Sequence, residues 1–125
     1  MSDHVRKKTA EQLTEAQGTP GIERKTAFEG DGHWFGHVVA AAETMSGWHH
    51  HGENTTVGYI LKGRVRLEYG PEGSLSTDVG AGEYFIVPAG AVHREGNDSS
   101  EDAEAIIVRF GNGPPVFPAE GPEPG

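Results

Sequence analysis

Three histidines in two separate segments have the spacing of a metal-binding site. His49 and His51 lie two residues apart, and His93 follows much later in the chain. In a β-strand, residues i and i+2 point to the same face, so His49 and His51 can reach one point while His50 points away. Neutral imidazoles bind divalent iron, nickel, copper, zinc and cobalt. Three nitrogen ligands on one side of an ion leave its other side open, which is typical of a catalytic site.

The two histidine segments resemble the two signature motifs of the cupin superfamily. The first has the form H-x-H-x4-T-x6-G over residues 49–63, and the second has the form G-E-x4-P-x-G-x2-H-x3-N over residues 82–97. The resemblance covers about residues 38–110. It implies an all-β, single-domain cupin β-barrel, a double-stranded β-helix similar to a jelly roll. It also implies that His49, His51 and His93 bind one divalent metal ion. Two matches in the expected order favour a metal site over a fortuitous run of surface histidines.

One position departs from the family pattern, because Thr56 stands where the family usually has a glutamate ligand. A threonine hydroxyl is a poor ligand. We therefore expect a three-histidine site that keeps the full charge of the divalent ion and attracts an anionic or enolate oxygen. The alternative is that Thr56 only fills space and bonds a water. Glu53 is the other candidate for a fourth ligand, although Gly52 can bend the chain between it and His51.

The segments around the histidines have the pattern of short β-strands joined by Gly and Pro turns. Residues 64–69 alternate apolar and polar side chains, as a strand with one solvated face does. Lys62-Gly63 before them is typical of a two-residue hairpin turn. The sequence also predicts an acidic surface loop over residues 95–104. The predicted strands cover residues 33–42, 57–61, 64–69, 74–79, 84–87 and 103–110.

The length of 125 residues predicts one domain. We divide it into an N-terminal polar segment (1–21), the cupin barrel (22–118) and a flexible tail (119–125). Within the first segment, residues 9–17 are predicted to form a short helix that Thr9 and Gln12 cap. Leu13 alone would anchor this helix, which could lie over the barrel or contribute to a dimer.

Four further residues are candidates for a substrate pocket: Trp34, His37, Tyr59 and Arg109. Arg109 lies in an apolar strand, where it can hold a substrate carboxylate through a bidentate pair or simply pair with an acidic side chain at the surface. His37 either lines the pocket, contributes to a dimer interface or has a structural role. Trp34 belongs either to the pocket wall or to the core.

The composition excludes several functions. The formal net charge of −9 argues against nucleic acid as a partner, since phosphate binding needs a basic patch, and it also disfavours an anionic membrane. The chain has no cysteine, so disulfides and thiolate chemistry are excluded. No apolar stretch is long enough for a signal peptide or a membrane span. We therefore expect a cytoplasmic protein.

From these residues we expect a metal-dependent cupin that acts on a small organic molecule, either anionic or enolisable. A dioxygenase-type oxidoreductase is favoured, because three facial histidines leave adjacent positions for substrate and O₂. The alternatives are a metal-dependent isomerase or lyase and a non-enzymatic cupin that binds a small ligand. The cofactor would be one divalent transition metal (Fe, Ni, Zn, Mn, Co or Cu). The resemblance also implies a homodimer.

Overall fold

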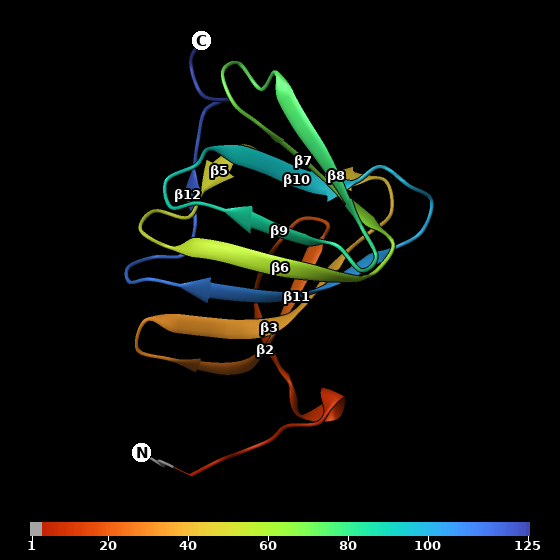
Figure 1. Cartoon of the computed structure of the whole chain (residues 1–125), viewed down its shortest axis with the longest axis vertical. Helices are drawn as coiled ribbons and strands as arrows, with labels where there is room; N and C mark the ends of the chain where they lie inside the picture. Colours follow the sequence, from red (N-terminus) through yellow and green to blue (C-terminus); the bar gives the residue numbers. More distant parts are fainter. Residues whose placement is uncertain (1–3) are drawn as a thin grey trace.

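The computed structural model describes residues 4–125, which form two antiparallel β-sheets that face each other (Figure 1). One sheet has the strand order β1-β2-β3-β11-β6-β9. The other has the order β12-β5-β10-β7-β8, with β4 paired to β10. No α-helix forms in these residues. They therefore contain no helix that could cross a membrane. The predicted all-β fold is therefore confirmed. The strands are β1 (Thr14–Thr19), β2 (Ile22–Gly30), β3 (His33–Ala40), β4 (Thr44–Met45), β5 (His49–His50), β6 (Thr55–Lys62), β7 (Arg64–Tyr69), β8 (Leu75–Gly80), β9 (Tyr84–Val87), β10 (His93–Asn97), β11 (Ala103–Phe110) and β12 (Phe117–Pro118).

The core lies between the two sheets, because successive side chains of a strand point to opposite faces. In β11 this alternation buries Ala103, Ala105 and Ile107 and exposes Phe110. The same alternation buries Arg109 of β11 and Arg24 of β2 among apolar neighbours. The interior of the barrel is therefore not wholly apolar. The buried hydrophobic cluster comprises Ile22, Ala40, Ile60, Val65, Leu67, Val79, Val87, Ala103, Ala105 and Ile107.

A turn forms at the predicted position, but the predicted hairpin is wrong, because β6 and β7 lie in different sheets and pair with other strands. Strand β6 ends at Lys62 and β7 begins at Arg64, so only Gly63 lies between them. Gly63 has φ of +76°, a left-handed conformation that glycine adopts without steric cost. This turn passes the chain from one sheet to the other.

The predicted helix over residues 9–17 is wrong. A single 3₁₀ turn, η1 (Ala10–Gln12), forms there, and the Gln12 side chain accepts a hydrogen bond from the Thr9 N–H. The chain then continues as β1, which pairs with β2 at the edge of the sheet. A helix with one apolar residue has no face to bury, whereas an edge strand gains backbone hydrogen bonds from its neighbour. At the other end of the chain, Glu123 pairs with Pro71. The division into segment, barrel and tail stays a prediction.

The predicted acidic loop begins later than expected, because residues 93–97 form strand β10 between β5 and β7. Asn97 ends this strand, and its side-chain amide donates hydrogen bonds to the carbonyls of Ala40 and Glu101. These bonds fix the loop that follows. The strand conformation of β10 also gives Glu95 the same orientation as His93, two residues earlier.

Gly96 on β10 allows β4 to approach closely, and we expect Gly96→Ala to disrupt that pairing. A Cβ at this position would clash with the backbone carbonyl of Thr44, which cannot move without separating β4 from β10. The free energy of unfolding should fall by about 2–3 kcal/mol, measured by urea denaturation. Gly121→Ala is the matched control, since a Cβ there contacts nothing. Equal stability of the two variants would show that β4 yields without cost.

Candidate metal centre

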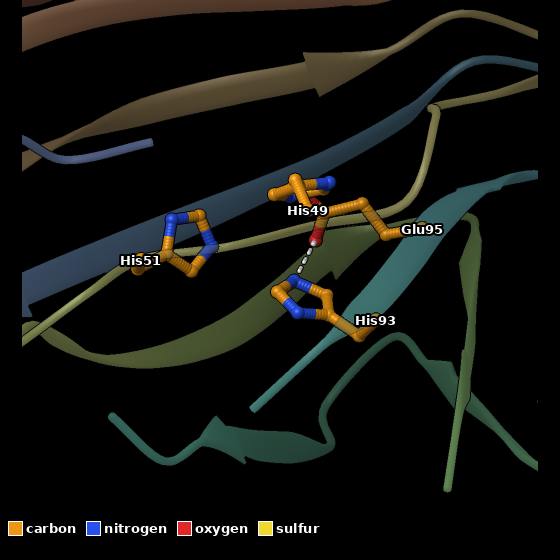
Figure 2. A group of neighbouring side chains, drawn as sticks. All are labelled: His49, His51, His93 and Glu95. Atoms are coloured by element: carbon orange, nitrogen blue, oxygen red, sulfur yellow. Dashed lines mark ion pairs between the residues drawn. The ribbon is translucent and has the colours of Figure 1, made fainter. Parts of the chain in front are cut away.

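Two strands bring the predicted histidines together. The pairing of β5 with β10 places His49 directly opposite His93, and their ring centroids are 4.4 Å apart. His51 follows the end of β5, and its ring centroid is 5.1 Å from each of the other two. Glu95 joins them from β10, as Figure 2 shows. One ligand atom from each of the four residues lies within 4.8 Å of all the others.

Hydrogen bonds to backbone carbonyls orient all three imidazole rings. Nδ1 of His49 lies 2.8 Å from the carbonyl oxygen of Gly47, and Nδ1 of His93 lies 2.9 Å from that of Ala91. Nδ1 of His51 lies 2.7 Å from the carbonyl oxygen of Pro115. A carbonyl only accepts, so each Nδ1 carries the proton and each neutral ring presents a free lone pair at Nε2. Outer hydrogen bonds of this kind are usual for histidines that bind metal.

The free nitrogens fit a metal ion. Nε2 of His49 and Nε2 of His93 are buried and have no hydrogen-bond partner, which costs free energy unless something binds there. Ligand atoms about 2.1 Å from a shared ion lie roughly 3–4 Å from one another, so a small contraction of the cluster would bring the four atoms into range. Three imidazoles and one carboxylate suit a divalent transition metal. The cluster could therefore hold such an ion.

The charges of the cluster also favour a cation. Burial alone would raise the pKa of Glu95, but His49, whose Nε2 lies 3.4 Å from the carboxylate, and the charges of His93 and Arg24 lower it to about 2. Burial lowers the pKa of His51 to about 4 and lowers that of His93. Burial opposes protonation of His49 too, but the adjacent Glu95 outweighs it and raises the pKa of His49. At neutral pH the cluster thus presents an ionised carboxylate beside neutral imidazoles of His51 and His93.

These pKa values predict that the metal-free protein loses stability in acid. An unfolded histidine has a pKa of about 6.5, whereas His51 in the folded protein has a pKa of about 4. As the pH falls through this window, the unfolded chain gains a proton at His51 that the folded chain does not. The free energy of unfolding should therefore fall by up to about 1.4 kcal/mol per pH unit from this residue. Urea denaturation at several pH values measures the slope. His51→Asn, which cannot titrate, should reduce it, and an unchanged slope would contradict the assignment.

The comparisons with known proteins agree with this fold. A family model described as "Cupin domain" matches residues 36–109, more than half of the chain. The chain belongs to the cupin family. A search of curated proteins gives no match for this cupin.

Solved structures share the fold of this cupin at low sequence identity. The polyketide cyclase RemF from Streptomyces resistomycificus is 20% identical with a TM-score of 0.71, and the match covers 98% of this chain and 90% of that one. KdgF from Halomonas sp. is 16% identical with a TM-score of 0.69, over 87% and 96% of the two chains. Oxalate decarboxylase from Bacillus subtilis is 16% identical with a TM-score of 0.66, over 80% of this chain and 28% of that chain. Such likeness establishes the fold and leaves the activity open.

The carboxylate of this cupin's cluster comes from a residue that the sequence analysis missed. Thr56 is buried and lines the same cavity as His51 and Glu95, with its hydroxyl unpartnered. Glu53 is exposed and does not join the cluster. The expectation of three histidines with no carboxylate is therefore corrected, because Glu95 supplies one negative charge beside the three rings. Counting two residues on from His93 along a strand would have found it.

The four residues predicted for a substrate pocket divide between the two faces of their sheet. Arg109 points into the barrel, and its guanidinium lies 5.3 Å from the ring centroid of Trp34. His37 and Tyr59 do not line the cavity that contains His51 and Glu95. His37 Nε2 lies 3.0 Å from a carboxylate oxygen of Glu104 at the outer surface, and Tyr59 packs on Tyr84. Both side chains point to the outer face, because in each strand the neighbouring residues of opposite parity point inward. Their assignment to a substrate pocket stays a prediction.

Two cavities contact the metal centre of this cupin, and a third shares residues with one of them. The inner cavity, of about 40 Å³, is lined by His51 and Glu95 together with Arg24, Thr56 and Arg109 and apolar side chains. An outer cavity of about 270 Å³ shares both arginines with it and lies between residues 17–19 and 114–116. A largely apolar cavity of about 450 Å³ contacts His93 from the side of β7, β8 and β9. Cavities therefore border the cluster at His51 and Glu95 and also at His93.

Proposed function

We propose that this cupin is a metal-dependent enzyme that acts on a small anionic organic molecule, and that its reaction is an O₂-dependent dioxygenation. The observation that carries the proposal is the set of four converging ligand atoms, two of them buried nitrogens without partners, beside enclosed cavities. A divalent iron ion bound there would supply redox chemistry and polarise an oxygen of the substrate.

The residues around the inner cavity support chemistry at the metal. Its lining contains no tyrosine or lysine and no histidine outside the cluster, and its other charged groups are two arginines. Arginine stays protonated and is a poor proton carrier. The chain therefore provides ligands, an apolar wall that limits access of water, and positive charge for an anion, while proton transfer falls to the cluster itself.

A metal-dependent isomerase or lyase is the second candidate, and Glu95 favours it. Its carboxylate is ionised at neutral pH and lies beside the inner cavity, where it could accept a proton from an enolisable carbon. Polyketide cyclase and oxalate decarboxylase, named above, are two different activities on this fold, so the fold does not decide between the candidates. A purely ligand-binding role is the third possibility and needs no metal.

The experiment begins with elemental analysis of protein purified without a histidine tag. Protein loaded with Fe(II) is then mixed with a panel of 2-oxo acids and 1,3-diketones, and O₂ consumption is recorded, with the zinc-loaded protein as control. Consumption by the iron form alone supports dioxygenation. Exchange of carbon-bound hydrogen in D₂O without O₂ uptake, followed by NMR, supports the isomerase or lyase. Absence of bound metal after loading contradicts both.

We also propose that two copies of the chain pair through the outer face of the β9-β6-β11-β3 sheet. Phe35, Tyr84, Ile86 and Phe110 are large apolar side chains with substantial exposure, and a cavity of about 480 Å³ lies on this face between β6, β9 and β11. Large exposed apolar patches usually mark interaction sites. Light scattering tests the proposal, and a monomer at all concentrations would contradict it.

A further inference from the structure

We propose that Arg24 and Arg109 bind the carboxylate of a small organic acid inside the barrel, and this inference rests on the proposed function because it names the substrate class of that site. Both arginines line the inner cavity next to His51 and Glu95, and both also line the outer cavity. They therefore stand where the two cavities meet. An anion that enters from outside would reach them before it reaches the metal centre.

Of the two buried guanidinium groups, only that of Arg24 has a charged partner, and that ion pair is long. Arg24 is 6% exposed and Arg109 is 8% exposed. Arg24 lies 4.0 Å from a carboxylate oxygen of Glu95, and Arg109 has no ion pair in residues 4–125. Burial lowers the pKa of both groups, and the charge of Arg24 lowers the pKa of Arg109 further. An arginine is nevertheless charged at neutral pH. Buried charges are usually paired, so the unpaired Arg109 beside the long Arg24–Glu95 pair indicates a missing anion.

The buried polar atoms without hydrogen-bond partners form two groups, one that suits a metal ion and one that suits an oxyanion. Five buried side-chain atoms in the described part of the chain have no hydrogen-bond partner. Two are the histidine nitrogens that face the metal centre. The other three, Thr19 Oγ1, Thr56 Oγ1 and Arg109 Nε, belong to residues that line the outer or inner cavity. All three can donate a hydrogen bond, which is what an oxyanion requires.

A bound metal ion would increase the excess of positive charge around the two arginines. Glu95 is the only acidic residue that lines the inner cavity, and it also belongs to the metal cluster. If Glu95 binds the ion, two guanidiniums and a divalent cation share a single carboxylate. A substrate carboxylate between the arginines would offset the excess positive charge. Arginine favours this role because its planar fork matches the two oxygens of a carboxylate.

The size of the cavities favours a carboxylate over a phosphate. The inner cavity of about 40 Å³ has room for roughly three water molecules. That space suits a planar carboxylate better than a tetrahedral phosphate with its larger set of oxygens. The outer cavity of about 270 Å³ would hold the rest of a small molecule. The expected substrate is therefore an organic acid with a few carbon atoms.

The test compares propionate with propionamide, which has nearly the same shape and no charge. Binding of each to the zinc-loaded protein is followed by NMR titration. We expect saturable binding of propionate, at least tenfold weaker binding of propionamide, and at least a tenfold loss of propionate affinity in Arg109→Met and Arg24→Met. Arg109→Lys should recover only part of the affinity, because lysine cannot form the bidentate pair. Arg64→Met is the control, since Arg64 is exposed and pairs with Asp98 at 2.9 Å.

Thermal unfolding separates a binding role from a structural one. If Arg109 serves an absent anion, Arg109→Met removes an unpaired buried charge, and the unfolding midpoint should stay the same or rise. The proposal would be overturned by two results together. The unfolding midpoint of Arg109→Met would fall clearly, and Arg109→Lys and Arg24→Lys would bind propionate with unchanged affinity. Tight binding of inorganic phosphate without binding of propionate would overturn the assignment to carboxylates.

Zinc affinity, measured by chelator competition in the same variants, distinguishes this inference from the proposed function. Normal zinc binding with propionate affinity that does not depend on the two arginines contradicts this inference alone. Arginine-dependent propionate binding to a protein that binds no zinc supports this inference and contradicts the metal-dependent function.

Discussion

Replacing His93 by alanine is expected to abolish metal binding while leaving the barrel folded. His93 contributes a buried nitrogen without a hydrogen-bond partner, 3.9 Å from a carboxylate oxygen of Glu95, and stands opposite His49. Loss of an outer hydrogen-bond partner of a ligand already costs ten- to a hundredfold in affinity, so loss of the ligand itself should cost at least about 1,000-fold. Chelator competition with zinc measures the affinity. Urea denaturation of the metal-free proteins should give stabilities within about 1 kcal/mol, because the lost contacts are offset by removal of an unsatisfied buried polar atom.

His50→Ala is the matched control for this prediction. The His50 ring stacks on Phe117 with centroids 5.0 Å apart and an interplanar angle of 7°, away from the cluster. Its removal should leave zinc affinity nearly unchanged. If His50→Ala released the metal and His51→Ala did not, the alternation of side chains along β5 would be the reverse of the one described.

Replacing Glu95 by glutamine is expected to weaken metal binding by about 100-fold and also to destabilise the metal-free protein. The amide keeps the shape of the side chain but removes the negative charge that a divalent ion prefers. Arg24 loses the carboxylate 4.0 Å away from it, and breaking a largely buried ion pair costs several kcal/mol when the geometry is good. Since this pair is long, we expect a loss of about 2 kcal/mol. The pKa of His49, which Glu95 raises, should fall, and NMR titration can follow it.

Glu104→Gln provides a matched control, because Glu104 also pairs with a histidine, His37, but at the outer surface. That variant should bind zinc like the unaltered protein. Equal zinc affinities of Glu95→Gln and Glu104→Gln would show that Glu95 is not a ligand. The cluster would then be a three-histidine site with the carboxylate free to act as a base.

The fold was predictable because the chain marks its strands with turn residues and period-two alternation. Gly63 and the apolar run of β11 illustrate the two signals. The N-terminal region was not predictable in the same way. Strand β1 has only polar and small side chains, and an edge strand depends on backbone hydrogen bonds to β2 that leave no pattern in its own sequence.

The candidate site was predictable only where a local pattern exists. His49 and His51 share a face by simple alternation, and the turn after Pro88 directs attention to His93. Glu95 was missed because an acidic stretch follows it and suggested a loop. Arg24 was missed because its position beside the metal centre depends on β2 lying across the barrel from β10, which is a property of the assembled sheets.

One hydrogen bond links the far end of the chain to the metal centre. Pro115 accepts the Nδ1 proton of His51, and the same proline lines the outer cavity. Asn54 ties the adjoining Pro114 carbonyl to the loop after His51. A molecule that enters the outer cavity and an ion that binds His51 therefore act on one shared segment. Thermodynamic linkage makes any such coupling reciprocal. If a molecule in the outer cavity raises the affinity for the ion, the ion must raise the affinity for that molecule by the same factor.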